Sequence, residues 1–185
     1  MSINRALISL CLVYGLSPCV HAGELILISS DLAQGQKLSN QLVFNGFGCT
    51  GENQSPALRW QGAPAETKSF AITVYDPDAP TGSGWWHWVM FDIPSTTHAL
   101  SRNAGSDDSK SLPKGAIQSR TDFGTAAFGG ACPPQGDTPH RYQFTVWALD
   151  ADTLGLDAHA SAAMVGFMLN QHKLANYTIE AWYNR

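Results

Sequence analysis

The sequence of 185 residues has little of what would assign it to several common classes of protein. After residue 22 there is no apolar stretch long enough to cross a membrane as a helix. Its 11 basic residues form no cluster and the net charge is −4, which argues against nucleic acid and anionic membrane surfaces as main partners. There is no internal repeat and no long heptad pattern, which argues against a repeat protein or a coiled coil.

Catalytic motifs are equally scarce. The chain has no Cys-x-x-Cys pair, no zinc-ligand spacing, no His-Glu-x-x-His and no serine in a nucleophile-elbow context. We therefore expect no enzymatic activity, no bound metal and no cofactor. A metal-assisted hydrolase that uses Asp76, Asp78, His87 and His140 stays open as an alternative, because carboxylates and imidazoles are metal ligands.

The N-terminal segment is typical of a secretory signal peptide. A short apolar stretch, Ala6–Leu16, precedes Val20-His21-Ala22, which has permissive residues one and three positions before a cleavage site. Cleavage of residues 1–22 would leave residues 23–185 as one periplasmic or secreted domain. The alternatives are a buried N-terminal helix and a lipoprotein acylated at Cys19, although a proline stands where a small residue normally precedes the acylated cysteine.

Two cysteines remain after removal of this segment, Cys49 and Cys132. A pair of cysteines in an exported chain is a candidate disulfide, and we expect these two to be joined. Two separate buried thiols are the alternative.

The chain is rich in glycine and proline, which is typical of a turn-rich β protein. Two predicted strands, Ser69–Tyr75 and Trp86–Ile93, form its centre, and the second is so continuously apolar that it must be buried. The prolines between them end the first strand, because proline fixes φ and cannot donate a backbone hydrogen bond. Asp76 and Asp78 therefore lie on a stiff turn at a strand end. If the strands are close in space, His87 faces these carboxylates.

Further strands are predicted over Glu24–Ser29, Leu42–Phe44, Ala57–Trp60, a segment that opens at His140-Arg141-Tyr142, and Thr178–Tyr183. Two segments between them, Ser95–Lys114 and Phe123–Gly136, are predicted as loops. The second loop carries aromatic residues and a cysteine, which favours an ordered structure.

One helix is predicted near the C-terminus, with Asp157 or Ser161 as its N-cap and its end at about residue 174. The apolar positions that are spaced as one helical face are Met164, Phe167, Met168 and Leu174.

Several spaced motifs together resemble the phosphatidylethanolamine-binding protein (PEBP) family. They are Asp76-Pro-Asp-Ala-Pro80, Trp86-His87-Trp88, Gly130-Ala131-Cys132-Pro133-Pro134 and His140-Arg141-Tyr142. The sequence is most similar to the exported form of the bacterial branch, the Raf kinase inhibitor-like proteins. It departs from the form common in that branch at Ala131, where proline is usual. We expect this change to cost loop rigidity and to leave the pocket intact.

This resemblance implies an antiparallel Greek-key β-sandwich with a peripheral C-terminal helix. It also implies a small pocket that binds phosphate or phosphorylated headgroups. The pocket residues carried over from the family are Asp76, Asp78, His87, His140 and Tyr142, together with the backbone amides of Gly129 and Gly130.

The chemistry of these residues agrees with an anion site. Imidazoles, a phenol and glycine amides are hydrogen-bond donors, and protonation of the imidazoles below about pH 6.5 would tighten anion binding. Asp76 is an exception because it would repel a fully ionised phosphate. It can still orient a histidine or accept a hydrogen bond from a protonated ligand oxygen.

Three classes of function follow from the sequence. The first is a binding protein for phosphate or phosphatidylethanolamine-like headgroups. The second is an inhibitor of a protein partner such as a kinase or a protease, and the third is the hydrolase named above. A small phosphorylated ligand or anion is the expected partner. A protein partner and a homodimer are open alternatives. Nucleic acid and an integral membrane segment are not expected.

Overall fold

A computed structural model describes residues 24–108 and 110–185, so the predicted signal peptide lies outside the described residues. The elements in chain order are β1 (Ile26–Ser29), the 3₁₀ helix η1 (Asn40–Leu42), β2 (Asn45–Gly46), β3 (Cys49–Thr50), β4 (Leu58–Gln61), β5 (Ser69–Asp76), β6 (Trp85–Pro94), β7 (Ala99–Leu100), β8 (Ile117–Gln118), β9 (His140–Leu149), α1 (Ala162–His172) and β10 (Lys173–Tyr183).

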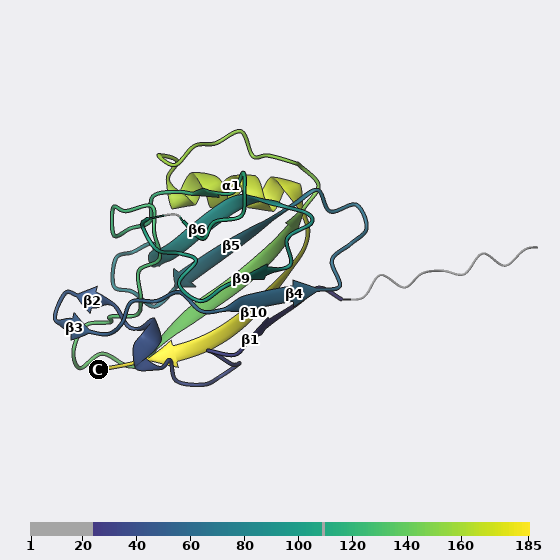
Figure 1. Cartoon of the computed structure of the whole chain (residues 1–185). Coiled ribbons are helices and arrows are strands. Elements are labelled where there is room, and N and C mark those ends of the chain that lie inside the picture. The colour runs from purple at the N-terminus through teal and green to yellow at the C-terminus, as the bar shows by residue number, and fades with distance from the viewer. Residues whose placement is uncertain (1–23, 109) are drawn as a thin grey trace, which may run out of the picture.

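The strands form two main antiparallel sheets (Figure 1). A five-stranded sheet has the order β10-β9-β5-β6-β8, and a three-stranded sheet has the order β1-β4-β7. A short ribbon, β2-β3, stands apart from both sheets. The expected β-sandwich architecture with a C-terminal helix is confirmed.

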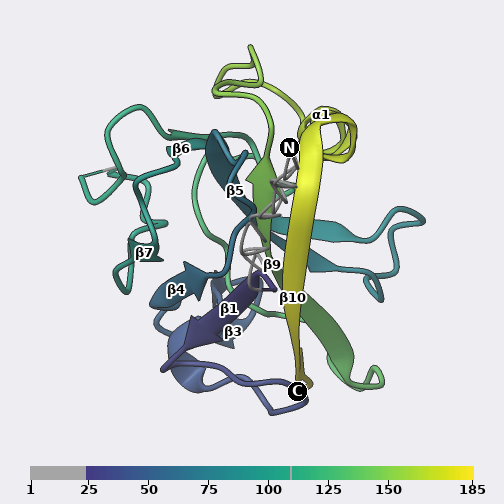
Figure 2. The same ribbon diagram turned by 90° about the vertical axis from the view of Figure 1, so that its right-hand side faces the viewer.

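The five-stranded sheet is covered on both faces, which explains its continuous apolar strands. One face packs against β1 and β4 through residues such as Ile72 of β5 and Met90 of β6. The opposite face packs against α1 through Ala71 of β5 and Val89 of β6. In Figure 1, α1 lies at one end of the molecule and β1 and β4 lie at the other, and Figure 2 shows the same order from the side.

The helix begins as predicted, but it buries a different face. The Ser161 hydroxyl accepts a hydrogen bond from the Met164 amide and caps the N-terminus. The residues buried against the sheet are Ala162, Val165 and Leu169. The predicted face was wrong, because Met164, Phe167 and Leu174 are 49%, 59% and 38% exposed. Of the predicted face, Met168 alone is partly buried and packs against the residues between the helix and the sheet.

Two other predicted boundaries also differ. Residues 42–44 were predicted as a strand, but η1 ends at Leu42 and Val43 makes only a single bridge to Ala131. The last strand begins at Lys173, directly after the helix, because pairing with β9 extends to Leu149. Within the described ranges no helix is both long and apolar enough to cross a membrane.

Candidate functional site: a buried polar cavity

The cavity forms where three strands of the five-stranded sheet meet at one edge. Antiparallel pairing places Asp76, at the end of β5, opposite Trp85 at the start of β6. The same pairing brings the start of β9, where His140 lies, beside the end of β5. A cavity of about 210 Å³ opens between these strand ends, and its walls include Asp76, His87, His140 and Tyr142. The structure thus brings together four of the predicted site residues.

Asp76 is almost completely buried, at 2% exposed, and hydrogen bonds hold its carboxylate in one position. Its Oδ1 accepts hydrogen bonds from the backbone amides of Asp78 and Ala79, at 2.8 and 3.1 Å, in the turn that follows β5. Its Oδ2 accepts a hydrogen bond from His140 Nδ1 at 2.8 Å. Aspartate closes such turns because its short side chain reaches the backbone two residues further on. The carboxylate is therefore fixed in position before any ligand arrives.

His87 is equally buried, and its protonated nitrogen is defined by its partner. Nδ1 lies 2.8 Å from the carbonyl oxygen of Gly129, which can only accept, so Nδ1 carries a hydrogen and donates it. Burial lowers the pKa of the His87 imidazole below its usual value, more than the nearby backbone carbonyls and Asp76 raise it. The neutral ring then has a lone pair on Nε2. The lowered pKa makes the protonated His87 donor that the sequence suggested less favourable.

Tyr142 contributes a hydroxyl group that has no partner. Its side chain is 1% exposed, and its oxygen makes no hydrogen bond to any part of the chain that the structure describes. Burial, and next the negative charge of Asp76, raise the pKa of the Tyr142 phenol, so the hydroxyl stays protonated. The hydroxyl lies close to the Asp76 carboxylate, which also raises this pKa, but the two groups do not meet in hydrogen-bond geometry. A buried hydroxyl without a hydrogen-bond partner is costly.

Asp78 does not have the predicted position in the pocket. Its carboxylate binds Arg141, accepting hydrogen bonds from the backbone amide at 2.8 Å and from Nε and Nη2 at 2.9 and 2.7 Å. These bonds lower the pKa of Asp78, chiefly through the guanidinium. The cavity wall is formed by the neighbouring Asp76, and Asp78 instead joins the turn after β5 to the start of β9.

Gly129 and Gly130 also have a different role from the predicted one. The Gly129 amide donates to the carbonyl of His87 at 2.8 Å, and the Gly130 amide donates to Asn53 Oδ1 at 2.7 Å. Both amides are therefore already in use. A Cβ on Gly129 would lie 2.3 Å from the Phe123 ring, so glycine is needed for that ring to pack there. These glycines hold His87 and Phe123 in place.

Three aromatic residues line the mouth of the cavity: Phe47, Trp85 and Phe123. Trp85 is one of the tryptophans expected from the sequence in the core and the pocket wall, whereas Phe47 and Phe123 were not selected. Phe123 contacts the other two, with ring centroids 5.9 Å from Phe47 and 5.4 Å from Trp85. Phe47 is 67% exposed and adopts a positive φ of 52°. Such a backbone conformation is uncommon for a bulky residue, and only the surrounding structure can maintain it. No sequence pattern marks Phe47 or Phe123.

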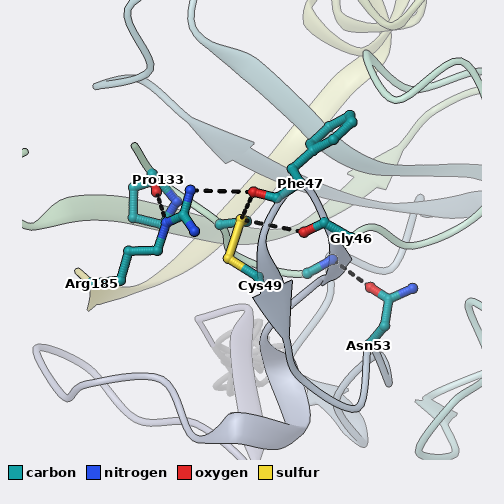
Figure 3. Close-up of a disulfide and its surroundings, with 8 residues drawn as sticks. Gly46, Phe47, Cys49, Asn53, Pro133 and Arg185 are labelled. Carbon is teal, nitrogen blue, oxygen red and sulfur yellow. Dashed lines mark hydrogen bonds between the residues drawn. A yellow bond between two sulfur atoms is a disulfide. The ribbon is translucent and has the colours of Figure 1, made fainter. Parts of the chain in front are cut away.

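The disulfide between Cys49 and Cys132 is present, as predicted (Figure 3). It joins β3 to the loop before β9; the two cysteines are 83 positions apart in sequence and their Cα atoms are 6.0 Å apart. Arg185 strengthens the same contact by donating from Nε to the Pro133 carbonyl at 2.6 Å and from Nη2 to the Phe47 carbonyl at 3.3 Å. Cys132, Phe47 and Pro133 all line the cavity, so these bonds hold one wall together.

A search of the described residues finds no group of three or more His, Cys, Asp or Glu side chains arranged to hold a metal ion. Asp76, His87 and His140 instead form hydrogen bonds with one another or with the backbone. The fold is that of a β-sheet protein with a small cavity at one edge of its main sheet.

The chain belongs to the phosphatidylethanolamine-binding protein family, whose sequence pattern matches residues 28–184. It is 55% identical over 155 residues to YbcL of Escherichia coli, covering 84% of this chain and 85% of YbcL. It is 52% identical over 158 residues to YbhB of the same organism, covering 85% of this chain and 99% of YbhB. The bacterial branch predicted from the motifs is confirmed.

The structure of the chain is also similar to the crystal structure of Escherichia coli YbcL, which is described as a member of the mammalian PEBP family. The TM-score is 0.87 at 53% identity, and the superposition covers 88% of this chain and 99% of YbcL. The chain is therefore a PEBP-family binding protein.

Proposed function

We propose that the cavity binds the phosphate group of a small phosphorylated molecule. The observation that carries this proposal is the buried Tyr142 hydroxyl, which makes no hydrogen bond to the described residues. It lies beside Asp76 and His140, which are hydrogen-bonded to each other. A buried hydroxyl of this kind is satisfied by a polar ligand atom, and a phosphate group offers several oxygen atoms within one small volume.

The size of the cavity agrees with a headgroup. At about 210 Å³ it is smaller than the cavities of roughly 300–1,000 Å³ that enclose drug-sized ligands. A phosphate group fits inside, and the organic part of the ligand extends past Phe47, Trp85 and Phe123 at the mouth. Free phosphate and phosphoethanolamine are both ligands of this kind.

Titration calorimetry on wild type and Tyr142→Phe tests the proposal directly. The variant removes one oxygen atom that makes no hydrogen bond within the described chain, so the fold should remain intact. Loss of a hydrogen bond to a charged ligand costs about 1.5–3 kcal/mol, so the affinity for phosphoethanolamine should fall roughly ten- to hundredfold.

Tyr177→Phe is the matched control, because Tyr177 lies on β10 opposite Val146 and is not among the residues that line the cavity. Its affinity should equal that of the wild type. Equal affinity in Tyr142→Phe and wild type would mean that phosphate ligands bind elsewhere, and the proposal would be wrong.

We also propose that the ligand is bound without chemical conversion. Asp76 is engaged by three N–H groups and His87 Nδ1 by the Gly129 carbonyl, and burial keeps the neighbouring Tyr142 hydroxyl protonated and therefore a weak nucleophile. Phosphorus NMR of phosphoethanolamine and of its glycerol diester, incubated with the protein, should show unchanged signals. Release of inorganic phosphate would support the hydrolase alternative.

Export is the third part of the proposal, and it rests on the sequence. Cleavage after Ala22 should give a periplasmic or secreted protein that begins Gly23-Glu24-Leu25. N-terminal sequencing of the mature protein checks this prediction. A different start, or a membrane-bound form acylated at Cys19, would contradict it.

A further inference from the structure

The cavity offers more hydrogen-bond acceptors than donors. A carboxylate has about four lone-pair sites. Three of those of Asp76 accept hydrogen bonds, from the amides of Asp78 and Ala79 and from His140 Nδ1. The remaining site is on Oδ2, and Asp76 forms part of the cavity wall. Asp76 can therefore accept one hydrogen bond from a ligand.

His87 is a second acceptor. Its Nδ1–H is used by the Gly129 carbonyl, and its buried ring favours the neutral form, so Nε2 has a lone pair and no hydrogen. The ring packs edge-on against Tyr142 and Phe123, with centroids 5.1 and 5.3 Å away. It is therefore fixed in orientation and cannot exchange its two nitrogens.

Donors and positive charges are scarce by comparison. The residues described as lining the cavity include no Lys and no Arg. The guanidinium groups next to the cavity walls are already engaged, since Arg141 binds Asp78 and Arg185 donates to the carbonyls of Pro133 and Phe47. The amides of Gly129 and Gly130 also donate within the protein. The second ring nitrogen of His140, Nε2, lies 3.5 Å from Asp137 Oδ2. The Tyr142 hydroxyl makes no hydrogen bond to the described residues and is left as a donor for a ligand.

We propose that the cavity selects a protonated phosphate, that is, free phosphate or the terminal group of a phosphomonoester that still carries a P–OH, over phosphodiesters and sulfate. This inference rests on the proposed phosphate site. The P–OH donates to Asp76, and an unprotonated phosphate oxygen accepts from Tyr142. A second P–OH, present in free dihydrogen phosphate, donates to His87 Nε2. A fully ionised phosphate would instead place its oxygens against the Asp76 carboxylate, which repels them.

A phosphodiester cannot satisfy this arrangement at any pH near neutrality. Its phosphate has already lost its only ionisable proton, and sulfate is likewise unprotonated. The headgroup of an intact phospholipid is a diester. The preferred ligands are therefore free phosphate and phosphomonoesters, including the headgroup after its release from the lipid.

Ionisable side chains of the protein could also titrate between pH 5 and pH 8. The experiment therefore has to distinguish their effect on affinity from protonation of the ligand. The titratable and charged side chains around Asp76 come from its own turn, from β6, from the loops and from β9 and β10. They are Asp78, His87, Asp122, Asp137, His140, Arg141, Tyr142 and Tyr183. Titration of any of these groups gives one midpoint that is the same for every ligand.

Calorimetry on the wild-type protein between pH 5 and pH 8 tests the inference with four ligands. Phosphoethanolamine and glycerophosphoethanolamine are a matched monoester and diester, inorganic sulfate is the unprotonated anion, and methylphosphonate has a higher second pKa than a phosphomonoester. Phosphoethanolamine should bind at least about tenfold more tightly than the diester or sulfate at pH 5.

The affinity for phosphoethanolamine should fall by about tenfold per pH unit above its second pKa of about 6. The corresponding fall for methylphosphonate should begin at a higher pH. Equal binding of sulfate or of the diester, or one midpoint shared by both protonating ligands, would overturn the inference and leave the phosphate site standing. Failure of every phosphate ligand to bind would overturn the proposed function and this inference together.

Asp76→Asn provides a second test of the same selection. The amide can present N–H groups where the carboxylate could only accept, so the preference for phosphoethanolamine over sulfate should shrink to less than about threefold. Circular dichroism checks that this variant folds. Unchanged selectivity in a folded variant would contradict the role of Asp76, and if the variant does not fold, the wild-type ligand series decides.

Discussion

His140 Nδ1 donates a hydrogen bond of 2.8 Å to Asp76 Oδ2, and both side chains are at most 4% exposed. The two residues are 64 positions apart in sequence and join the end of β5 to the start of β9. This bond fixes the carboxylate on which the proposed ligand selection depends. It therefore affects both the stability of the fold and the shape of the cavity.

The first prediction concerns this bond. His140→Ala removes the donor and leaves the buried Asp76 carboxylate with two backbone partners. We expect the free energy of unfolding in urea to fall by about 2–3 kcal/mol. His98→Ala, at an exposed position, is the matched control and should change stability by less than about 0.5 kcal/mol. Equal stability of the two variants would show that the bond contributes little.

The second prediction concerns the disulfide. Replacing Cys49 and Cys132 together by serine removes a link that closes a long loop, which typically lowers the free energy of unfolding by about 2–4 kcal/mol. Affinity for phosphoethanolamine should fall as well, because the bridge holds one wall of the cavity. Denaturant titration and calorimetry measure the two effects. In the exported wild-type protein, thiol labelling under denaturing conditions should be negligible, and stoichiometric labelling of both cysteines would rule out the bridge.

The third prediction concerns Phe47, which is exposed at the mouth of the cavity. Phe47→Ala should leave the affinity for inorganic phosphate unchanged and weaken the binding of phenyl phosphate by about two- to tenfold, the value of one aromatic pair. Phe167→Ala on α1 is the control, because its ring is similarly exposed but lies on another element. Calorimetry with both ligands decides. An equal loss for both ligands would mean that Phe47 supports the cavity instead of contacting the ligand.

The fourth prediction concerns Asp92 on β6, where burial raises the pKa of the carboxyl. A carboxyl with a raised pKa in the folded state destabilises that state as the pH rises through this pKa. Asp92→Asn removes the charge. Asparagine also tolerates the φ of 55° at this position and keeps an oxygen for the Leu154 amide, which Asp92 Oδ1 binds at 2.9 Å.

We therefore expect Asp92→Asn to be more stable than wild type at pH 7 by less than about 1 kcal/mol, because a partly exposed charge is screened by solvent. The difference should disappear near pH 3, where the carboxyl is protonated in both states. Thermal unfolding at the two pH values measures it. A variant less stable than wild type at pH 7 would contradict this account of Asp92.

Local patterns predicted a large part of the fold. The apolar runs that became β5 and β6 identified the central strands to within about two residues, because a strand buried on both faces needs such a run. The sequence left Asp157 and Ser161 as alternative N-caps, and in the structure Ser161 binds an orphan amide of the first helical turn. The buried face of the helix was not predictable, because apolar residues lie on more than one side of it. Only packing against the sheet decides that Ala162, Val165 and Leu169 are buried and that Met164 and Phe167 are exposed.

By itself the sequence determined which chemical groups are available and where the chain turns. The two cysteines, the Asp-Pro-Asp turn and the Trp-His-Trp and His-Arg-Tyr motifs are all visible in it. Tertiary structure alone decided which hydrogen-bonding group meets which partner. Asp78 pairs with Arg141, the glycine amides pair with His87 and Asn53, and Tyr142 has no partner among the described residues. Each group can form only a few bonds, and the competition for them is settled when segments distant in sequence come together.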